Sequence, residues 1–298
     1  GAYTEDDVKS CSRAFTGWTF RQPLSLYPMG HHQAIFEFLP DDHDDGEKTF
    51  LGQSGNLNGE DIIDIIVKQP STARFISRHL YNFFVEDEPQ VPSWSIEPPR
   101  DEAAIQQLSK VFLDTGGDMR AVLKEMFNAD WFKDSKDKKK VKSPAELVAG
   151  LLKQTGEFRD PKPGMHDFAG AAAVMGQSLL NPPTVEGWHT GHEWIDSGTL
   201  SERINFAAKQ FKDASKPGIQ EMLQRAGSVN EDPAGLVSRC LDLMGGVRVS
   251  EETHRSLVEY TKDLETMDND PNGEGDQREA DVLNLLQMIV STVDYQFA

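Results

Sequence analysis

The chain has 298 residues, of which 38% are hydrophobic and 27% charged, enough to bury a sizeable core as one large domain or two smaller ones. Its formal net charge of -19, from 49 acidic and 30 basic residues, argues against nucleic acid or an anionic membrane surface as a partner. No apolar run approaches the ~20 residues of a membrane span, so the sequence predicts no membrane insertion.

The first elements follow from capping signals and breakers. Thr4 caps a helix, the Asp7 side chain bonds back to it, and Val8, Cys11 and Phe15 share one face of that helix. Residues 18–33 have the prolines and glycine of an irregular segment, and residues 35–39 form the only clear strand pattern. Residues 60–68 then predict an almost wholly apolar helix that must be buried on most sides.

From residue 71 onward the pattern is mainly helical, with apolar residues recurring at helical spacing as far as the final helix. Ser143, Pro144 and Glu146 form a strong helix start, with a cap, a proline in the first turn and a capping-box glutamate. The predicted fold class is therefore all-α, a multi-helix globular array with long irregular loops and at most one or two short strands. Residues 1–212 are predicted as a helical core and 213–298 as a C-terminal helical region, either separate or continuous with it. Cys11 and Cys240 lie on apolar helical faces and are predicted as buried thiols.

The segment Phe36–Gly52 gathers ionisable side chains between two apolar ends. His43 and Asp44, with Asp41 or Asp42 as a further member, are candidate metal ligands or an acid/base pair. Lys48 is a candidate for binding an anionic group. The alternative is structural, because a histidine and an aspartate in a turn also cap and cross-link it.

The segment Asn181–Ile195 is too rich in proline and glycine for a helix and carries two tryptophans. One interpretation is an aromatic binding surface, and the other is a rigid plug over the helical core. The candidate binding residues are Trp18, Trp188, His189, His192 and Trp194.

The segment Asp268–Glu279 fits the pattern of a calcium-binding EF-hand loop. Gly273 supplies the turn, whereas Pro271 and Gly275 are unusual at their positions, and a plain solvated loop is the alternative. The candidate Ca²⁺ ligands are Asp268, Asp270, Asn272, Glu274, Asp276 and Glu279.

Several separated motifs together resemble the bacterial family known as domain of unknown function 1800. They are the segments Tyr3–Val8, Arg13–Trp18, His43–Lys48, Lys142–Glu146 and Asn181–Trp188. The chain is similar to the C-terminal portion of a family member, with the resemblance fading after about Phe211. The resemblance implies a mostly helical fold and a periplasmic or extracellular location, and it implies no mechanism.

Two functional hypotheses follow. The first is a non-catalytic binding or assembly module of the cell envelope, with an envelope protein or extracellular polymer as partner. The second is a hydrolase that uses His43 and Asp44 as metal ligand or general base, with the segment Asn181–Ile195, called the tryptophan loop below, closing the site. The first is preferred because the sequence contains no nucleophile elbow, no His-Glu-x-x-His and no phosphate-binding glycine loop. The second requires His43 and Trp188 to meet in one pocket.

Overall fold

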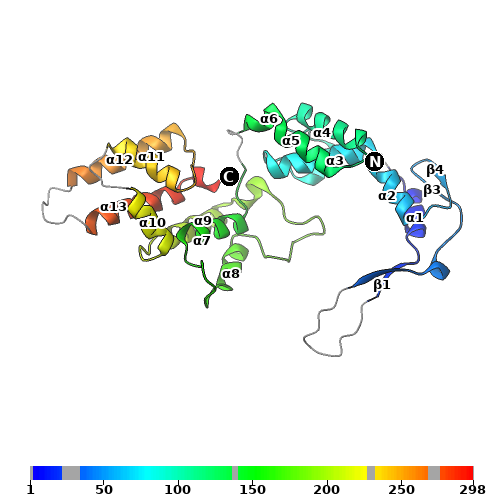
Figure 1. Ribbon diagram of the computed structural model, residues 1–298, viewed down its shortest axis with the longest axis horizontal. Helices are drawn as coiled ribbons and strands as arrows, with labels where there is room; N and C mark the ends of the chain where they lie inside the picture. Colours follow the sequence, from blue (N-terminus) through cyan, green and yellow to red (C-terminus); the bar gives the residue numbers. More distant parts are fainter. Residues whose placement is uncertain (1–2, 22–33, 136–139, 227–231, 268–275, 298) are drawn as a thin grey trace. The chain divides into compact units, whose positions relative to one another are not determined.

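The computed structural model describes residues 3–21, 34–135, 140–226, 232–267 and 276–297, with the backbone alone described at 263–267 and 276–278. The chain divides into two compact units (Figure 1). Unit 1 comprises residues 1–85 and 97–136, and unit 2 comprises residues 86–96 and 137–298. The boundary predicted at residue 212 does not coincide with this division, because it falls inside unit 2.

Unit 1 is built from helices and two hairpins. Its helix starts follow from capping: Thr4 and Asp7 form a capping box at the first helix, and Asn58 and Asp61 form another at the second. Pro70 begins the third helix, where its missing N–H is tolerated. The elements are α1 (Glu5–Ala14), β1 (Trp18–Arg21), β2 (Ile35–Phe38), η1 (Pro40–Asp42), β3 (Lys48–Phe50), β4 (Gln53–Gly55), α2 (Gly59–Val67), α3 (Pro70–Phe84), α4 (Glu102–Asp114), α5 (Met119–Asn128) and α6 (Asp130–Lys133).

The described residues contain four short strands, where the sequence predicts at most one or two. β1 pairs antiparallel with β2, with Trp18 opposite Phe38. β1 lies in the segment predicted to be irregular, whereas β2 coincides with the strand predicted at residues 35–39. β3 pairs with β4 across a tight turn in which Leu51 and Gly52 both have positive φ, 46° and 78°. Such turns favour Asn-Gly, so the sequence Leu-Gly gives little hairpin signal.

The core of unit 1 consists of several small clusters. One of them packs Ala14 of α1 and Phe50 of β3 against Ile62 and Ile65 of α2. The prediction that α2 is buried on most sides is wrong, because Ile63 and Ile66 are 46% and 38% exposed. A nine-residue helix at the edge of a small unit has one covered face, and the remaining isoleucines point away from it.

Unit 2 contains longer helices around one larger core. Ser143 and Glu146 form the predicted capping box at its first long helix. The elements are η2 (Val91–Ser95), α7 (Pro144–Thr155), α8 (Asp167–Val174), η4 (Gly191–Trp194), α9 (Ser197–Gln210), α10 (Pro217–Ala226), α11 (Pro233–Leu243), α12 (Glu251–Met267), α13 (Asp276–Ser291) and η5 (Asp294–Gln296).

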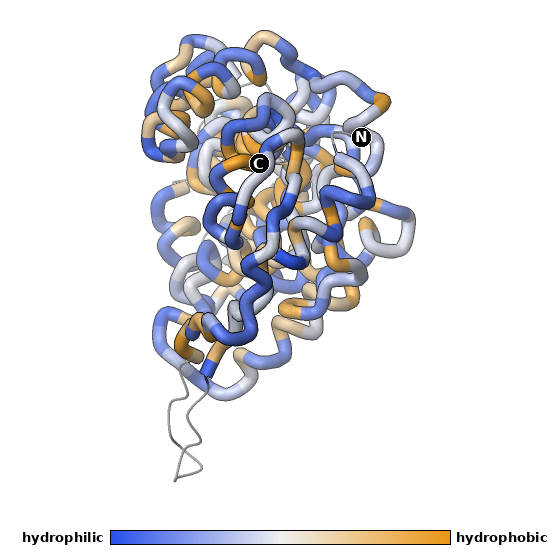
Figure 2. Tube along the Cα trace, turned by 90° about the vertical axis from the view of Figure 1, so that its right-hand side faces the viewer, coloured by the Kyte–Doolittle hydropathy of each residue, from blue (hydrophilic) through white to orange (hydrophobic). Residues whose placement is uncertain are grey.

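One continuous hydrophobic cluster extends from Leu147 in α7 to Tyr295 in η5. Residues before and after position 212 therefore share a core. Along the chain, hydrophobic and hydrophilic residues alternate within the helices (Figure 2), as amphipathic helices around a core require. The predicted fold class is confirmed: the described chain is mostly helical, with two small antiparallel sheets.

Candidate functional site

Asp44 is held in the turn after η1 by the guanidinium group of Arg13. Arg13 Nε donates to Asp44 Oδ2 at 2.6 Å and Nη2 to Oδ1 at 3.1 Å, while the Gly46 N–H donates to Oδ1 at 2.9 Å. The hydrogen bond from Arg13, followed by that from Gly46, lowers the pKa of the Asp44 carboxyl well below its usual range. A general base needs a pKa near the operating pH, and this carboxylate lies far from that condition.

His43 is oriented by the backbone of the turn that follows α1. Its Nδ1 lies 2.8 Å from the carbonyl oxygen of Thr16, and its ring packs edge-on against Phe38 with centroids 5.5 Å apart. Because a carbonyl only accepts, Nδ1 carries the hydrogen, and the neutral ring keeps its lone pair on Nε2. Nε2 is the atom that would bind a metal or accept a proton.

Lys48 lies beneath the same turn and is 1% exposed. Its ammonium group donates to the carbonyl oxygens of Asp44 and of Gly46, the latter at 3.1 Å. It also helps to lower the pKa of the Asp44 carboxyl by its charge. His43, Asp44 and Lys48 thus lie together in one turn and cross-link it, and metal binding or catalysis by them stays a prediction.

An apolar cleft of about 310 Å³ lies in unit 1, between α1, the β3–β4 turn and the α2–α3 junction. Phe50 and Leu51 form its floor, and Val8 and Ile66 are partly exposed walls. Its polar lining consists of Asp7, Gln69, Ser71 and Thr72, and Tyr3 and Cys11 complete it.

Asp7 connects α1 to the floor of the cleft. Its carboxylate accepts hydrogen bonds from the Thr4 N–H and hydroxyl and from the Leu51 N–H, each at 2.7 Å. These bonds, led by that from the Thr4 hydroxyl, lower the pKa of Asp7. The bond to Leu51 supports the positive φ of that residue, which is unfavourable for a leucine. The cleft floor is therefore fixed before any ligand binds.

The sequence analysis missed this cleft, although two signals for it are present. Val8 and Cys11 share a face of α1, and α2 has more isoleucines than one buried face can use. The sequence carries no signal for the packing of α1 against the β3–β4 hairpin, and this packing brings residues 8 and 51 together.

The tryptophan loop lies in unit 2 and is fixed from two sides. Trp194 of η4 is 7% exposed and packs near Gly176, whereas Trp188 is half-buried. The Gln90 side-chain amide donates to the Thr190 carbonyl at 2.8 Å. Burial of Trp194 agrees with the plug interpretation at that residue.

The remaining predicted binding residues belong to both units. His189 and His192 are exposed, the first bonded to the Glu193 carboxylate and the second 6.4 Å from the ring of Phe297. Trp18 belongs to unit 1, where it packs edge-on against Phe15 at 4.9 Å and Phe36 at 5.1 Å. Trp18 and His43 thus belong to one unit and the tryptophan loop to the other.

Most of the predicted calcium loop lies outside the described residues, namely positions 268–275 with Asp268, Asp270, Asn272 and Glu274. Asp276 begins α13, and Glu279 is exposed on it. Within the described ranges no group of three or more His, Cys, Asp or Glu side chains could hold a metal ion. Calcium binding at this loop stays a prediction.

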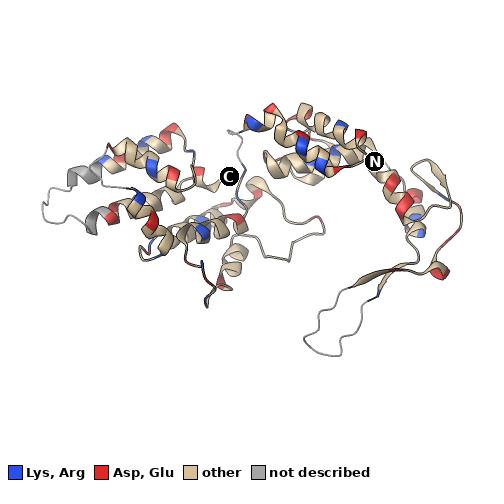
Figure 3. Cartoon of the chain, in the orientation of Figure 1, with Lys and Arg blue, Asp and Glu red and all other residues tan. Residues whose placement is uncertain are grey.

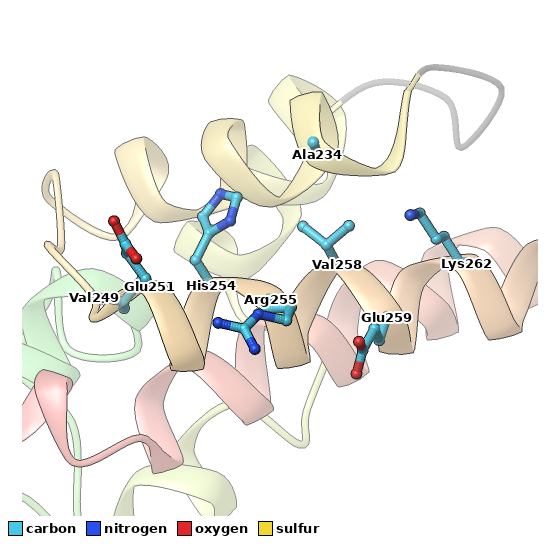
Figure 4. A pocket seen from close by; sticks show the side chains of 8 residues that line it. All are labelled: Ala234, Val249, Glu251, His254, Arg255, Val258, Glu259 and Lys262. Carbon is cyan, nitrogen blue, oxygen red and sulfur yellow. The ribbon is translucent and has the colours of Figure 1, made fainter.

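A second cleft, of about 460 Å³, lies along α12 in unit 2 (Figure 4). Its charges are of both signs, Arg255 and Lys262 with Glu251 and Glu259, so it favours neither cations nor anions. The cleft is lined by Ala234, Val249, Glu251, His254, Arg255, Val258, Glu259 and Lys262.

Fold and sites define a mostly helical protein of two units, with an apolar cleft in the first. The chain matches the family model described as Protein of unknown function (DUF1800) over residues 1–297, and it belongs to this family. The match continues past Phe211, so the expectation that the resemblance fades there is wrong. No curated protein and no solved structure matches the chain. Among the described residues, no helix has the length and hydrophobicity of a membrane span.

Proposed function

We propose that this protein is a non-catalytic binding module of the cell envelope, and that the cleft between α1 and the α2–α3 junction receives an apolar side chain of a partner protein. The observation that carries the proposal is the cleft itself. Its volume of about 310 Å³ is at the small end of ligand pockets, typically ~300–1,000 Å³. A pre-formed apolar site with a few polar groups at its edge suits an anchoring side chain.

The polar lining indicates how the rest of the ligand would bind. Gln69, Ser71 and Thr72 carry donors and acceptors that suit the amide groups of a peptide backbone. The first turn of α1 holds Glu5, Asp6 and Asp7, and α2 is rich in acidic side chains (Figure 3). These charges favour a peptide with basic residues beside its apolar anchor.

A peptide titration tests the proposal. The probe is Ac-Lys-Leu-Leu-Lys-amide, added to protein with labelled isoleucine and valine methyl groups and followed by NMR. We expect the methyl signals of Val8 and Ile66 to shift, and Ac-Glu-Leu-Leu-Glu-amide and Ac-Lys-Gly-Gly-Lys-amide to cause smaller shifts. The variant Ile66→Lys should abolish the response.

Ile63→Lys is the matched control, because Ile63 is an exposed isoleucine on the same helix that does not line the cleft. Equal loss of binding in both variants would show that the cleft is not the binding site. The periplasmic or extracellular location is part of the proposal, supported by the resemblance to exported proteins. Fractionation of the native cells, followed by immunoblotting of each fraction, tests it.

The alternative function is a hydrolase in which His43 acts through Nε2. It is supported by the Thr16 carbonyl, which fixes the tautomer that leaves Nε2 as the acceptor. The role of Asp44 as general base is disfavoured by its two bonds to Arg13 and its lowered pKa. Metal analysis of the purified protein and of His43→Ala would detect a metal whose content falls in the variant, and equal, metal-free samples would end the metal-dependent form of this alternative.

A further inference from the structure

The side of α12 that lines the second cleft carries charges that alternate in sign along the helix. Figure 4 shows these side chains along α12, with Ala234 of α11 across the cleft. The charged residues of alternating sign are, in chain order, Glu251, Arg255, Glu259 and Lys262, and all four are exposed. Because they follow one another at spacings of three or four positions, they share one face of the helix, called the α12 face below.

These four side chains form no salt bridge within the described part of the chain. Glu251 and Arg255 are four positions apart, as are Arg255 and Glu259, and side chains at this spacing can pair along one helix. The same cleft is lined by the half-buried apolar side chains of Val249 and Val258. Apolar side chains with charges at their rim are the usual composition of a protein–protein interface.

The balance of charge on the α12 face differs from that of the whole chain. The chain has a formal net charge of -19, so two copies repel each other overall. The α12 face has two acidic and two basic side chains and therefore no net charge. Two copies can approach closely at this face, provided that charges of opposite sign meet.

We propose that a second copy of this chain docks on the α12 face, with the two α12 helices antiparallel and related by a two-fold axis. In this arrangement Glu251 of one copy faces the partner's Lys262, and Arg255 faces the partner's Glu259. Each ion pair forms twice, because a two-fold interface uses the same surface on both copies. The midpoints of the two pairs lie half a residue apart along the helix, which is less than about 1 Å, so one axis serves both.

The order of the charges requires the antiparallel orientation. In a parallel two-fold pair each residue would lie level with its own copy, so Glu251 would be level with glutamate and Lys262 with lysine, and like charges across an interface oppose binding. The order minus, plus, minus, plus is its own complement only when the second helix runs the opposite way. Because α11 packs beside α12, the contact would join two helix pairs into a four-helix arrangement. It is separate from the cleft in unit 1, so neither proposal depends on the other.

Sedimentation equilibrium of the full chain, over a range of concentrations, tests the proposal. We expect the wild-type protein to form a reversible dimer. Glu251→Lys brings a lysine opposite the partner's Lys262, and Lys262→Glu brings a glutamate opposite the partner's Glu251. Each variant should raise the dissociation constant by about tenfold or more, because two ion pairs become two contacts between like charges. A wild-type protein that stays monomeric at every concentration would overturn the proposal.

The variant that combines Glu251→Lys with Lys262→Glu gives the decisive measurement. Opposite charges face each other again in this variant, so its dissociation constant should return to near the wild-type value. The two positions are eleven residues apart, roughly 16 Å along one helix, so their charges cannot pair within one copy. Recovery can therefore arise only between two copies. A combined variant that dimerises no better than the two single variants would overturn the proposal.

Glu202→Lys is the matched control, because Glu202 is an exposed glutamate on α9 of the same unit and the change of charge is the same. We expect it to dimerise like the wild type, and a loss of dimer equal to that in Glu251→Lys would overturn the proposal. Circular dichroism checks the fold of each variant. Should Glu251→Lys fail to fold, Lys262→Glu against the wild type gives the same comparison, and a dimer that Lys262→Glu leaves unchanged would place the contact elsewhere on the chain.

Discussion

Lys48 in unit 1 and Arg203 in unit 2 are both fully buried cations, yet their surroundings differ. The Lys48 ammonium group donates to two carbonyl oxygens and lies near the carboxylate of Asp44, which Arg13 holds from the solvent side. Arg203 has a carbonyl and an amide as acceptors, and its neighbouring charges are the ammonium group of Lys142 and the carboxylate of Glu146. A buried charge with its acceptors present has its desolvation cost offset, whereas a buried charge with an unpaired donor retains part of that cost.

The largest expected effect compares Lys48→Met with Arg203→Met. Removing Lys48 leaves the backbone carbonyl oxygens of Asp44 and Gly46 without their donor, while Arg13 still holds the Asp44 carboxylate. At about 1–3 kcal/mol for each buried unpaired group, we expect a cost of about 3–5 kcal/mol of unfolding free energy. Removing Arg203 also removes a buried cation that has one unpaired donor within the described chain, so we expect a smaller cost, about 1–2 kcal/mol. Urea denaturation measures both.

The control is Lys110→Met, an exposed lysine paired with Asp114, for which a change below about 0.5 kcal/mol is expected. Equal costs for Lys48→Met and Arg203→Met would contradict the difference between the two buried cations.

The pH dependence of stability should separate the two regions by pH range, because stability rises with pH in both regions but in different windows. The pKa of Asp44 is lowered by Arg13, so its contribution is present above the unfolded-state pKa of about 3.9 and is lost as pH falls below it. The pKa of Lys142 is lowered to about 8 from 10.5, so the unfolded state binds more protons between these values and stability rises with pH there.

Difference curves isolate each contribution. The unfolding free energy of the wild type minus that of Asp44→Asn should decrease as the pH falls below about 3.9. The unfolding free energy of the wild type minus that of Lys142→Met should increase as the pH rises from about 8 to 10.5. Stability measured by urea denaturation at each pH provides both curves. A flat alkaline difference would show that Lys142 keeps the pKa of an exposed lysine.

The helical elements could be predicted from the sequence because their signals are local. The capping boxes at Thr4 with Asp7 and at Ser143 with Glu146 both form as predicted. The hairpins could not be predicted in the same way. Residues 22–34 separate β1 from β2, and the β3–β4 turn contains a leucine, Leu51, at positive φ.

The surroundings of Arg203 and the candidate cleft depend on contacts between distant residues, and this limits what the sequence reveals. Arg203 shares a helical face with Leu200 and Ala207, a signal that an arginine lies on a buried stripe. Its partner Gln296 is 93 positions away, and no spacing rule connects the two. The cleft likewise needs Val8 beside Leu51, which only the packing of α1 on β3 provides.

The smallest expected effect concerns access rather than stability. Cys240 is fully buried, and burial raises the pKa of its thiol to about 12, whereas Cys11 is half-buried beside the cleft and its pKa is raised by burial alone. The thiolate is the reactive form, so iodoacetamide at pH 8 should alkylate Cys11 slowly and Cys240 only after unfolding in urea.

Mass spectrometry of the tryptic peptides follows both sites and links them to the cleft. Because Cys11 lines the cleft, Ac-Lys-Leu-Leu-Lys-amide should slow its alkylation, while Ac-Lys-Gly-Gly-Lys-amide should not. An unchanged rate at Cys11 with saturating leucine peptide would place that peptide elsewhere on the protein. Native-state alkylation of Cys240 at the rate of Cys11 would instead show that the core of unit 2 opens locally, with α11 leaving the cluster that covers its cysteine.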